Sequence, residues 1–221
     1  GQDTRRGTFS QRHAVLVDVH TEAEYCPLAH VDAGQAPFML YDSVLSEYAA
    51  LGFEYGYSVA DPQALVAWEA QFGDFMNGAQ IIIDQFIVAA EDKWGQTSSV
   101  TLLLPHGFEG QGPEHSSARI ERFLALCAEA NLRVVYPTTA AQYFHVLRRQ
   151  VLARARKPLV CFTPKRYLRM PQSRSTVAEL TDGTFHEMLD DRNPDLDAAG
   201  VRRVLLCTGK IGHELMDRRD R

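Results

Sequence analysis

The sequence predicts an α/β protein built on a mainly parallel sheet flanked by helices. Short apolar runs typical of buried strands alternate with longer segments in which apolar residues recur at helical spacing. This alternation is typical of parallel sheets, because each strand is followed by a helix that packs back onto the sheet. With 45% hydrophobic and 23% charged residues among 221, the composition is that of an ordinary globular protein.

Six apolar runs are expected to form strands, at residues 13–17, 65–68, 100–104, 132–135, 159–162 and 204–207. Helical spacing predicts helices over residues 46–57, 78–90, 120–130 and 140–152, the first of them capped by Ser46. Residues 166–192 are polar and 193–200 read as an exposed connection. A strand within 201–211 and a short helix over 214–217 are too little to bury a core of their own. We therefore expect one domain over residues 1–192, and over 193–221 a linker and the truncated start of another.

Composition also indicates the kinds of partner and the cellular compartment to expect. A net charge of −5 gives no support for a nucleic-acid partner. No apolar run approaches the roughly 20 residues of a membrane span, and the polar start lacks the apolar segment of a signal peptide. The four cysteines form no CxxC pair and are typical of a reducing compartment. These features favour a cytoplasmic protein without a membrane partner.

A glycine-rich loop with two histidines follows the strand expected at 100–104. The loop carries His106 and His115, and its glycines at 107, 110 and 112 indicate unusual dihedral angles or close approach to a ligand. Ligands of parallel sheets bind at the carboxyl ends of strands. The histidines are candidates for acid–base groups, metal ligands or satisfied loop residues. Zinc and EF-hand spacings, GxGxxG, a Walker loop and GxSxG are all absent, which disfavours metal, nucleotide and hydrolase sites.

Glu47 opens the helix expected at 46–57, and two interpretations of it stay open. A carboxylate in a first turn complements the helix dipole. Alternatively, a carboxylate in a partly buried cleft can exchange a proton with a ligand. Glu54 is the competing carboxylate, expected to form a structural pair. The phenylalanines of WEAQFGDF are expected in the core, although one beside a glycine at a strand end could stack on a planar ring.

Five segments together resemble a known family. They read RGTFSQRHAVL, LSEYAALGFEYGYS, WEAQFGDFMNGAQIIIDQFI, LLPHGFEGQGPEHSSARIERFL and RKPLVCFTPKRYLR. They are similar to the decarboxylating, thiamine diphosphate-dependent component of 2-oxoglutarate dehydrogenase, over residues 1 to about 190. The segment VRRVLLCTGKIGHEL resembles the start of that family's carboxy-terminal domain. The opening GQDTRRGTFSQRHAVL looks most like the actinobacterial branch, which includes multifunctional 2-oxoglutarate decarboxylases.

The resemblance implies a transketolase-like pyrimidine-binding domain in which Glu47 bonds the pyrimidine nitrogen of the cofactor. Phe75 matches the aromatic residue that packs on that ring, and Leu45 matches the apolar residue just before the glutamate, which is also expected to bind the cofactor. Gln71 is expected to bind the cofactor from the substrate side, where His115 also lies.

Three further expectations come from the same resemblance. His106 looks like a second active-site histidine, and Gln2 occupies a position near the substrate at which many relatives carry glutamate. Arg149 and Lys157 match a basic region that binds acetyl-CoA as an activator, although a solvated helix face explains them equally well. Mg²⁺ is expected on a domain outside this chain, since the GDG…N motif is missing from the sequence.

As part of a longer chain, the protein is expected to decarboxylate 2-oxoglutarate and transfer the succinyl group to the lipoyl domain of a dihydrolipoyl succinyltransferase, a step of the tricarboxylic acid cycle. A homodimer is expected, because the family's cofactor site lies between two chains. The alternatives are a relative that uses 2-oxoadipate and a non-catalytic interaction fragment of the same fold.

Overall fold

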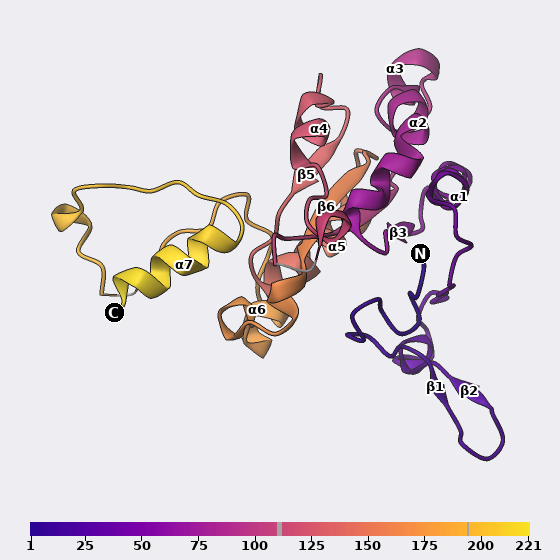
Figure 1. The fold of residues 1–221 in the computed structure, drawn as a ribbon, viewed down its shortest axis with the longest axis horizontal. Coiled ribbons are helices and arrows are strands. Elements are labelled where there is room, and N and C mark those ends of the chain that lie inside the picture. The colour runs from indigo at the N-terminus through magenta and orange to yellow at the C-terminus, as the bar shows by residue number, and fades with distance from the viewer. Residues whose placement is uncertain (110–111, 194) are drawn as a thin grey trace.

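The computed structural model describes residues 1–109, 112–193 and 195–221, and at its centre is a four-stranded parallel sheet (Figure 1). Its order is β3-β4-β6-β5, and its strands are β3 (Ala67–Glu69), β4 (Thr101–His106), β5 (Arg133–Val135) and β6 (Leu159–Pro164). Every neighbouring pair runs parallel, with Leu102 opposite Val160 between the two central strands. The α/β fold with a mainly parallel sheet is therefore confirmed.

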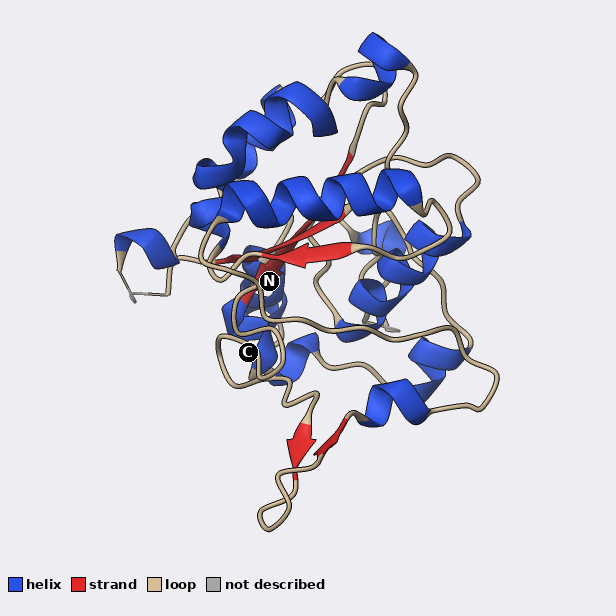
Figure 2. Cartoon of the chain, turned by 90° about the vertical axis from the view of Figure 1, so that its right-hand side faces the viewer, coloured by secondary structure: helices blue, strands red, loops and turns tan. Residues whose placement is uncertain are grey.

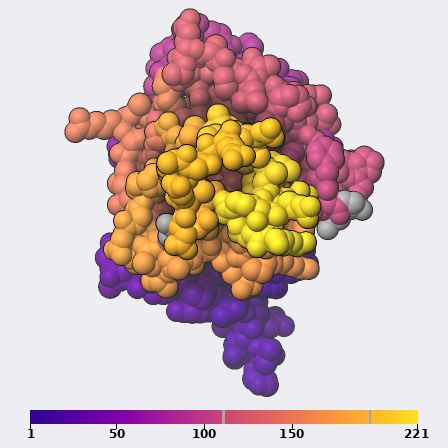
Figure 3. Space-filling model, turned by 90° about the vertical axis from the view of Figure 1, so that its left-hand side faces the viewer, coloured from indigo at the N-terminus to yellow at the C-terminus, as the bar shows by residue number. Residues whose placement is uncertain are grey.

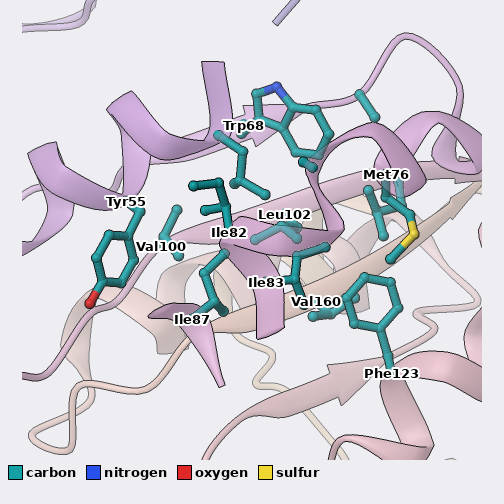
Figure 4. Packing of buried hydrophobic residues seen from close by; sticks show 14 of the residues in the cluster. Tyr55, Trp68, Met76, Ile82, Ile83, Ile87, Val100, Leu102, Phe123 and Val160 are labelled. Carbon is teal, nitrogen blue, oxygen red and sulfur yellow. The ribbon is translucent and has the colours of Figure 1, made fainter. Parts of the chain in front are cut away.

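The central strands are buried on both faces because helices cover each side (Figure 2). Successive side chains of a strand point to opposite faces. On one face, Leu102 and Val160 join the larger core cluster, together with buried residues of the helical segments before β4 (Figure 4). On the other face, Leu103 and Cys161 pack with Val146 of α5 (Ala140–Leu152). This two-sided burial explains why both strands read as continuous apolar runs.

The helices expected at 46–57 and 140–152 are present. The first is α1 (Glu47–Ala60), and Ser46 caps it by accepting a hydrogen bond from the Ala49 amide at 3.2 Å. The second, α5, is capped by the Thr139 hydroxyl. The remaining α-helices are α2 (Gln80–Ile82), α3 (Ala90–Trp94), α4 (Ile120–Ala125), α6 (Val177–Thr181) and α7 (Lys210–Arg219).

Two expected helices differ from their predicted course. Residues 78–90 are not one α-helix: the 3₁₀ segment η2 (Gly73–Ala79) leads into α2, and the π-helical η3 (Ile83–Ile87) separates α2 from α3. The helix expected over 120–130 ends at Ala125. Glu129 and Ala130 have φ angles of 50° and 58°, in the left-handed region that a right-handed helix cannot use. The other short helical turns are Pro27–His30, Pro113–His115, Lys165–Leu168, Pro171–Ser173 and Ala198–Gly200.

Two of the expected strands are corrected by the structure. Residues 13–17 contribute only β1 (Leu16–Val17), which pairs antiparallel with β2 (Glu24–Tyr25) in a hairpin away from the main sheet (Figure 1). His13 has a φ of 46°, so the chain turns there instead of extending. Residues 204–207 form no strand: Val204 and Leu206 are 74% and 80% exposed, and no described strand pairs with them. An apolar run becomes a strand only where a neighbour offers backbone hydrogen bonds.

The C-terminal helix α7 is longer than the expected turn at 214–217. It packs on the domain through His213, whose Nε2 lies 2.8 Å from the Thr138 carbonyl oxygen, and through Lys210, whose Nζ lies 3.8 Å from a Glu109 oxygen. Figure 3 shows this segment in yellow across one face of the molecule. Among the described residues, no helix is both long enough and apolar enough to cross a membrane.

Candidate functional site

The start of α1 places Glu47 at the rim of a narrow crevice. Because Ser46 satisfies the Ala49 amide, Glu47 becomes the first helical residue, with its side chain half-buried. The crevice is lined by Gln2, Ser43, Ser46, Glu47, Ala50, Trp68, Glu69 and Gln71. The fold thus brings together three residues predicted for the site, Gln2, Glu47 and Gln71, from widely separated parts of the chain. A carboxylate at this position also complements the helix dipole, so the two interpretations of Glu47 are compatible.

The carboxylate of Glu47 has different surroundings at its two oxygens. Gln2 donates a hydrogen bond from Nε2 to Oε1 at 3.3 Å. Near Oε2 lies Gly78, where an added Cβ would be 3.4 Å from the oxygen. A side chain at this position would be in van der Waals contact with the carboxylate, and glycine leaves Oε2 without that contact. Oε1 thus accepts a hydrogen bond from an amide, whereas Oε2 has no hydrogen-bond partner among the described residues and lies near Gly78.

Polar contacts attach the N-terminal segment to the end of β3. Gln71 donates from Nε2 to Asp3 Oδ2 at 3.2 Å. Arg12 donates from Nη2 to both carboxylate oxygens of Glu69, at 2.7 and 2.8 Å, and from Nη1 to the Thr4 carbonyl at 2.6 Å. This partly buried ion pair is held by several hydrogen bonds, unlike an exposed surface pair. It fixes the segment that carries Gln2 beside the crevice.

Four aromatic rings form a second part of the site, and we call Phe9, Phe72, Phe75 and His115 the aromatic cluster. Phe72 lies at its centre. It contacts Phe9 and Phe75 edge to face, with ring centroids 5.7 and 5.6 Å apart. His115 stacks on Phe72 with centroids 3.8 Å apart and ring planes 19° from parallel. The predicted site residues Phe75 and His115 are therefore joined through a phenylalanine that follows Gln71 directly.

His106 lies in different surroundings from His115. It is 8% exposed, and its ring meets Phe108, Tyr136 and Phe162 edge to face. Its Nδ1 lies 3.0 Å from the Ala118 amide nitrogen and accepts that hydrogen bond, so a neutral ring carries its proton on Nε2. Burial lowers the pKa of His106, which keeps the ring neutral near neutral pH.

The loop between the two histidines has the backbone expected of its glycines. Gly107 and Gly112 have φ angles of 136° and 123°, which other residues rarely adopt. The Gly107 amide donates to the Ser116 carbonyl at 2.8 Å, which closes the base of the loop. The third glycine of the loop, at position 110, lies outside the described residues.

The remaining predicted site residues lie outside the crevice lining. Leu45 is 86% exposed just before α1. Arg149 donates to Glu187 at 3.1 Å, and Lys157 donates to Glu91 at 2.6 Å, so both cations already have anionic partners.

Glu54 does not form the structural pair expected of it. No hydrogen bond or ion pair connects its carboxylate to another side chain in the described part of the chain, and burial raises its pKa.

Sequence reasoning missed the central role of Phe72 and the contact of Gly78 with Glu47. The signal for Phe72 was its place beside Gly73 at a strand end. A Cβ on Gly73 would lie 2.4 Å from the Ala118 side chain and 2.5 Å from the Pro105 carbonyl oxygen, so only glycine fits there. For Gly78, no local pattern pointed to a residue on another element.

Comparison with known proteins shows the family to which the chain belongs. Residues 1–171 match the model described as "Transketolase, pyrimidine binding domain", and residues 174–221 match "2-oxoglutarate dehydrogenase C-terminal". Because the first match covers most of its length, and its sheet is parallel with helices on both faces, the chain belongs to the family of transketolase-type pyrimidine-binding domains.

Within that family, the chain is similar to 2-oxoglutarate dehydrogenase E1 components. It is 57% identical to the one from Cupriavidus necator and 55% identical to the one from Azotobacter vinelandii, over 99% of this chain in each case. The E1 component of Brucella ovis is 54% identical over 100% of the chain. The chain spans only 23% of the length of each of these relatives. The resemblance to the decarboxylating component is thereby confirmed, while the actinobacterial branch and the division at residues 192 and 193 stay predictions.

Proposed function

We propose that this chain supplies the pyrimidine-binding part of a thiamine diphosphate site in a 2-oxoglutarate dehydrogenase E1 component. The whole enzyme would decarboxylate 2-oxoglutarate and pass the succinyl group to the lipoyl domain of a dihydrolipoyl succinyltransferase. The observation that supports the proposal is the half-buried carboxylate of Glu47, which accepts a hydrogen bond from Gln2 at Oε1 and has Gly78 near Oε2. Similarity to E1 components over the whole chain supports the same assignment.

The residues around Glu47 fit a planar aminopyrimidine. When bound, thiamine diphosphate supplies the electron sink that decarboxylation of a 2-oxo acid requires. Glu47 would exchange a proton with the pyrimidine nitrogen of the bound cofactor, and Gln2 would keep the carboxylate oriented by its hydrogen bond to Oε1. Phe75, half-buried on η2, offers a ring face for packing against the pyrimidine. Gln71 lines the same crevice and is positioned through Asp3.

The two histidines have separate roles in this proposal. His115 is the group that holds and delivers a proton on the substrate side. His106, which is buried and accepts from the Ala118 amide, positions the loop that carries His115. Since Gly107 and Ser116 close that loop by a backbone hydrogen bond, an ordered His106 fixes both ends of it.

A homodimer completes the proposed site. Large apolar side chains are exposed along and before α1, among them Leu45, Phe53 and Tyr57 at 86%, 67% and 37%. Exposed apolar surface of this kind is typical of protein interfaces and supports a second chain against this helix. In the described part of the chain, no group of three or more His, Cys, Asp or Glu side chains could hold a metal. We also propose that Mg²⁺ is held by a domain outside this chain, as the family resemblance implies.

Membership of the actinobacterial branch, with its acetyl-CoA activation and cytoplasmic location, is also part of the proposal. Arg149 and Lys157 lie at and beyond the end of α5 and would bind the phosphate groups of the activator. An effector phosphate would have to replace Glu187 at Arg149 and Glu91 at Lys157. Only the opening sequence and this local positive charge support the acetyl-CoA site.

Replacing Glu47 tests the proposed function. In the full-length enzyme, Glu47→Gln should lower the rate of CO₂ release from 2-oxoglutarate by at least about 100-fold, because the amide cannot exchange the proton. Binding of thiamine diphosphate with Mg²⁺, measured by calorimetry, should persist, since the variant keeps the size of the side chain. Glu54→Gln is the matched control on the same helix and should retain the wild-type rate. A fully active Glu47→Gln enzyme, or loss confined to Glu54→Gln, would refute the assignment.

A further inference from the structure

The imidazole of His115 is held by its face and not by its nitrogens. It lies in the short turn Pro113–His115, where its amide makes a long bond of 3.4 Å to the Gly112 carbonyl and its own carbonyl accepts from Lys165. These contacts hold the backbone alone. The ring itself stacks on Phe72 at 3.8 Å, and no hydrogen bond reaches either ring nitrogen from the described residues.

Stacking of this kind orients a ring without occupying its polar edge. The nitrogen atoms of imidazole lie at the perimeter of the ring, while the partner covers a face. His115 therefore keeps both nitrogens available in one defined plane. His106 is the contrast within the same loop region, because its Nδ1 is occupied by the Ala118 amide.

Phe72 is itself held firmly by the sheet. It precedes η2 in an extended conformation, and its ring is held edge to face by Phe9 and Phe75. The next residue, Gly73, is packed so closely against Pro105 and Ala118 that no side chain fits there. Phe72 is thus fixed next to the edge strand of the sheet, and through the ring stack it orients a histidine on a separate loop.

We propose that Phe72 is a positioning residue that sets the orientation of the His115 imidazole for proton transfer. This inference rests on the proposed function, in which His115 acts on the substrate side. Phe72 need not touch the substrate or the cofactor: it acts through His115. Because proton transfer requires hydrogen-bond geometry, release of the stack lowers turnover although the histidine remains present.

A double-mutant cycle in the full-length enzyme tests the proposal. Phe72→Leu removes the aromatic face and should lower kcat for 2-oxoglutarate by about tenfold, since misplacement by 1 Å can cost about 10²-fold. Affinity for thiamine diphosphate with Mg²⁺, measured by calorimetry, should change by less than about twofold. Phe72→Tyr keeps the aromatic ring, and its kcat should equal that of the wild type. In a His115→Ala background, Phe72→Leu should have no further effect on kcat, because the residue to be oriented is gone.

The control is Phe86→Leu, which removes another half-buried phenylalanine with two aromatic neighbours, Tyr55 and Trp94, and should leave kcat unchanged. The positioning role would be overturned, with the proposed function intact, if the losses of kcat from Phe72→Leu and His115→Ala multiply in the double variant. A low kcat in Phe72→Tyr would overturn it as well. A fully active His115→Ala enzyme would overturn both the catalytic role of His115 and this inference. Loss of cofactor binding in Phe72→Leu, with the fold retained by circular dichroism, would assign Phe72 to the cofactor site instead.

Discussion

Acidification should destabilise this protein through His106. The imidazole is 8% exposed, accepts a hydrogen bond at Nδ1 from the Ala118 amide and is surrounded by aromatic rings. Protonation would place a second donor against that amide and a charge in an apolar environment. Glu109 and Glu121 favour the charged form and Lys165 opposes it, but burial dominates and lowers the pKa of His106.

The direction and size of the pH effect on stability follow from the protonation of His106 in the folded and in the unfolded chain. The unfolded chain takes up a proton on His106 below its ordinary pKa of about 6.5, whereas the folded protein resists it. The free energy of unfolding therefore falls as the pH falls below about 6.5. Between about pH 7.5 and 5.5, one histidine kept neutral throughout contributes a loss of at most about 1.4 kcal/mol. For a chain of this length, that corresponds to a fall in Tm of about 3–6 °C.

The measurement is urea unfolding at both pH values, followed by the fluorescence of the buried Trp68. The wild type is compared with His106→Asn, whose side-chain oxygen can still accept from the Ala118 amide. His20→Asn, in an exposed turn, is the control and should keep the wild-type pH dependence. The difference in the free energy of unfolding between the wild type and His106→Asn should be smaller at pH 5.5 than at pH 7.5, because only the wild type loses stability through His106. A gap that is equal at both pH values would refute the argument that His106 is buried in its neutral form.

Two further predictions concern α5 and the segment that follows it. Gln150→Leu should lower the free energy of unfolding by about 3 kcal/mol, because the buried amide donates to the Ser99 and Lys157 carbonyls at 3.0 and 2.8 Å and both would lose their donor. The exposed Gln63→Leu is the control in the same urea titration, and a loss below about 1 kcal/mol for Gln150→Leu would contradict the reasoning. In the full-length enzyme, the acetyl-CoA concentration that gives half-maximal stimulation should rise about tenfold in Arg149→Ala and in Lys157→Ala. Each variant removes a charge-assisted contact to the activator. Unchanged stimulation would place the activator elsewhere.

The elements that local pattern predicts well are those whose burial is nearly complete. β4 and β6 lie within two residues of the expected runs because helices cover both faces, so nearly every position must be apolar. α5 begins and ends at the expected residues, with Thr139 as its cap. For α1, the cap at Ser46 also located Glu47 at the first helical position. The chemical roles of the candidate site residues came from the family motifs, because apolar periodicity predicts only where a residue lies in a helix or strand.

Local pattern and motifs in the sequence are therefore enough to predict the α/β class, the capped helix that begins with Glu47 and the family to which the chain belongs. The packing of the folded chain determines which apolar run pairs as a strand: residues 204–207 read as a strand, but no strand in the described part of the chain pairs with them. The packing of separate elements also places Phe72 against His115 and Gly78 beside Glu47. These contacts join residues far apart in the chain, and no local pattern encodes a distance between separate elements.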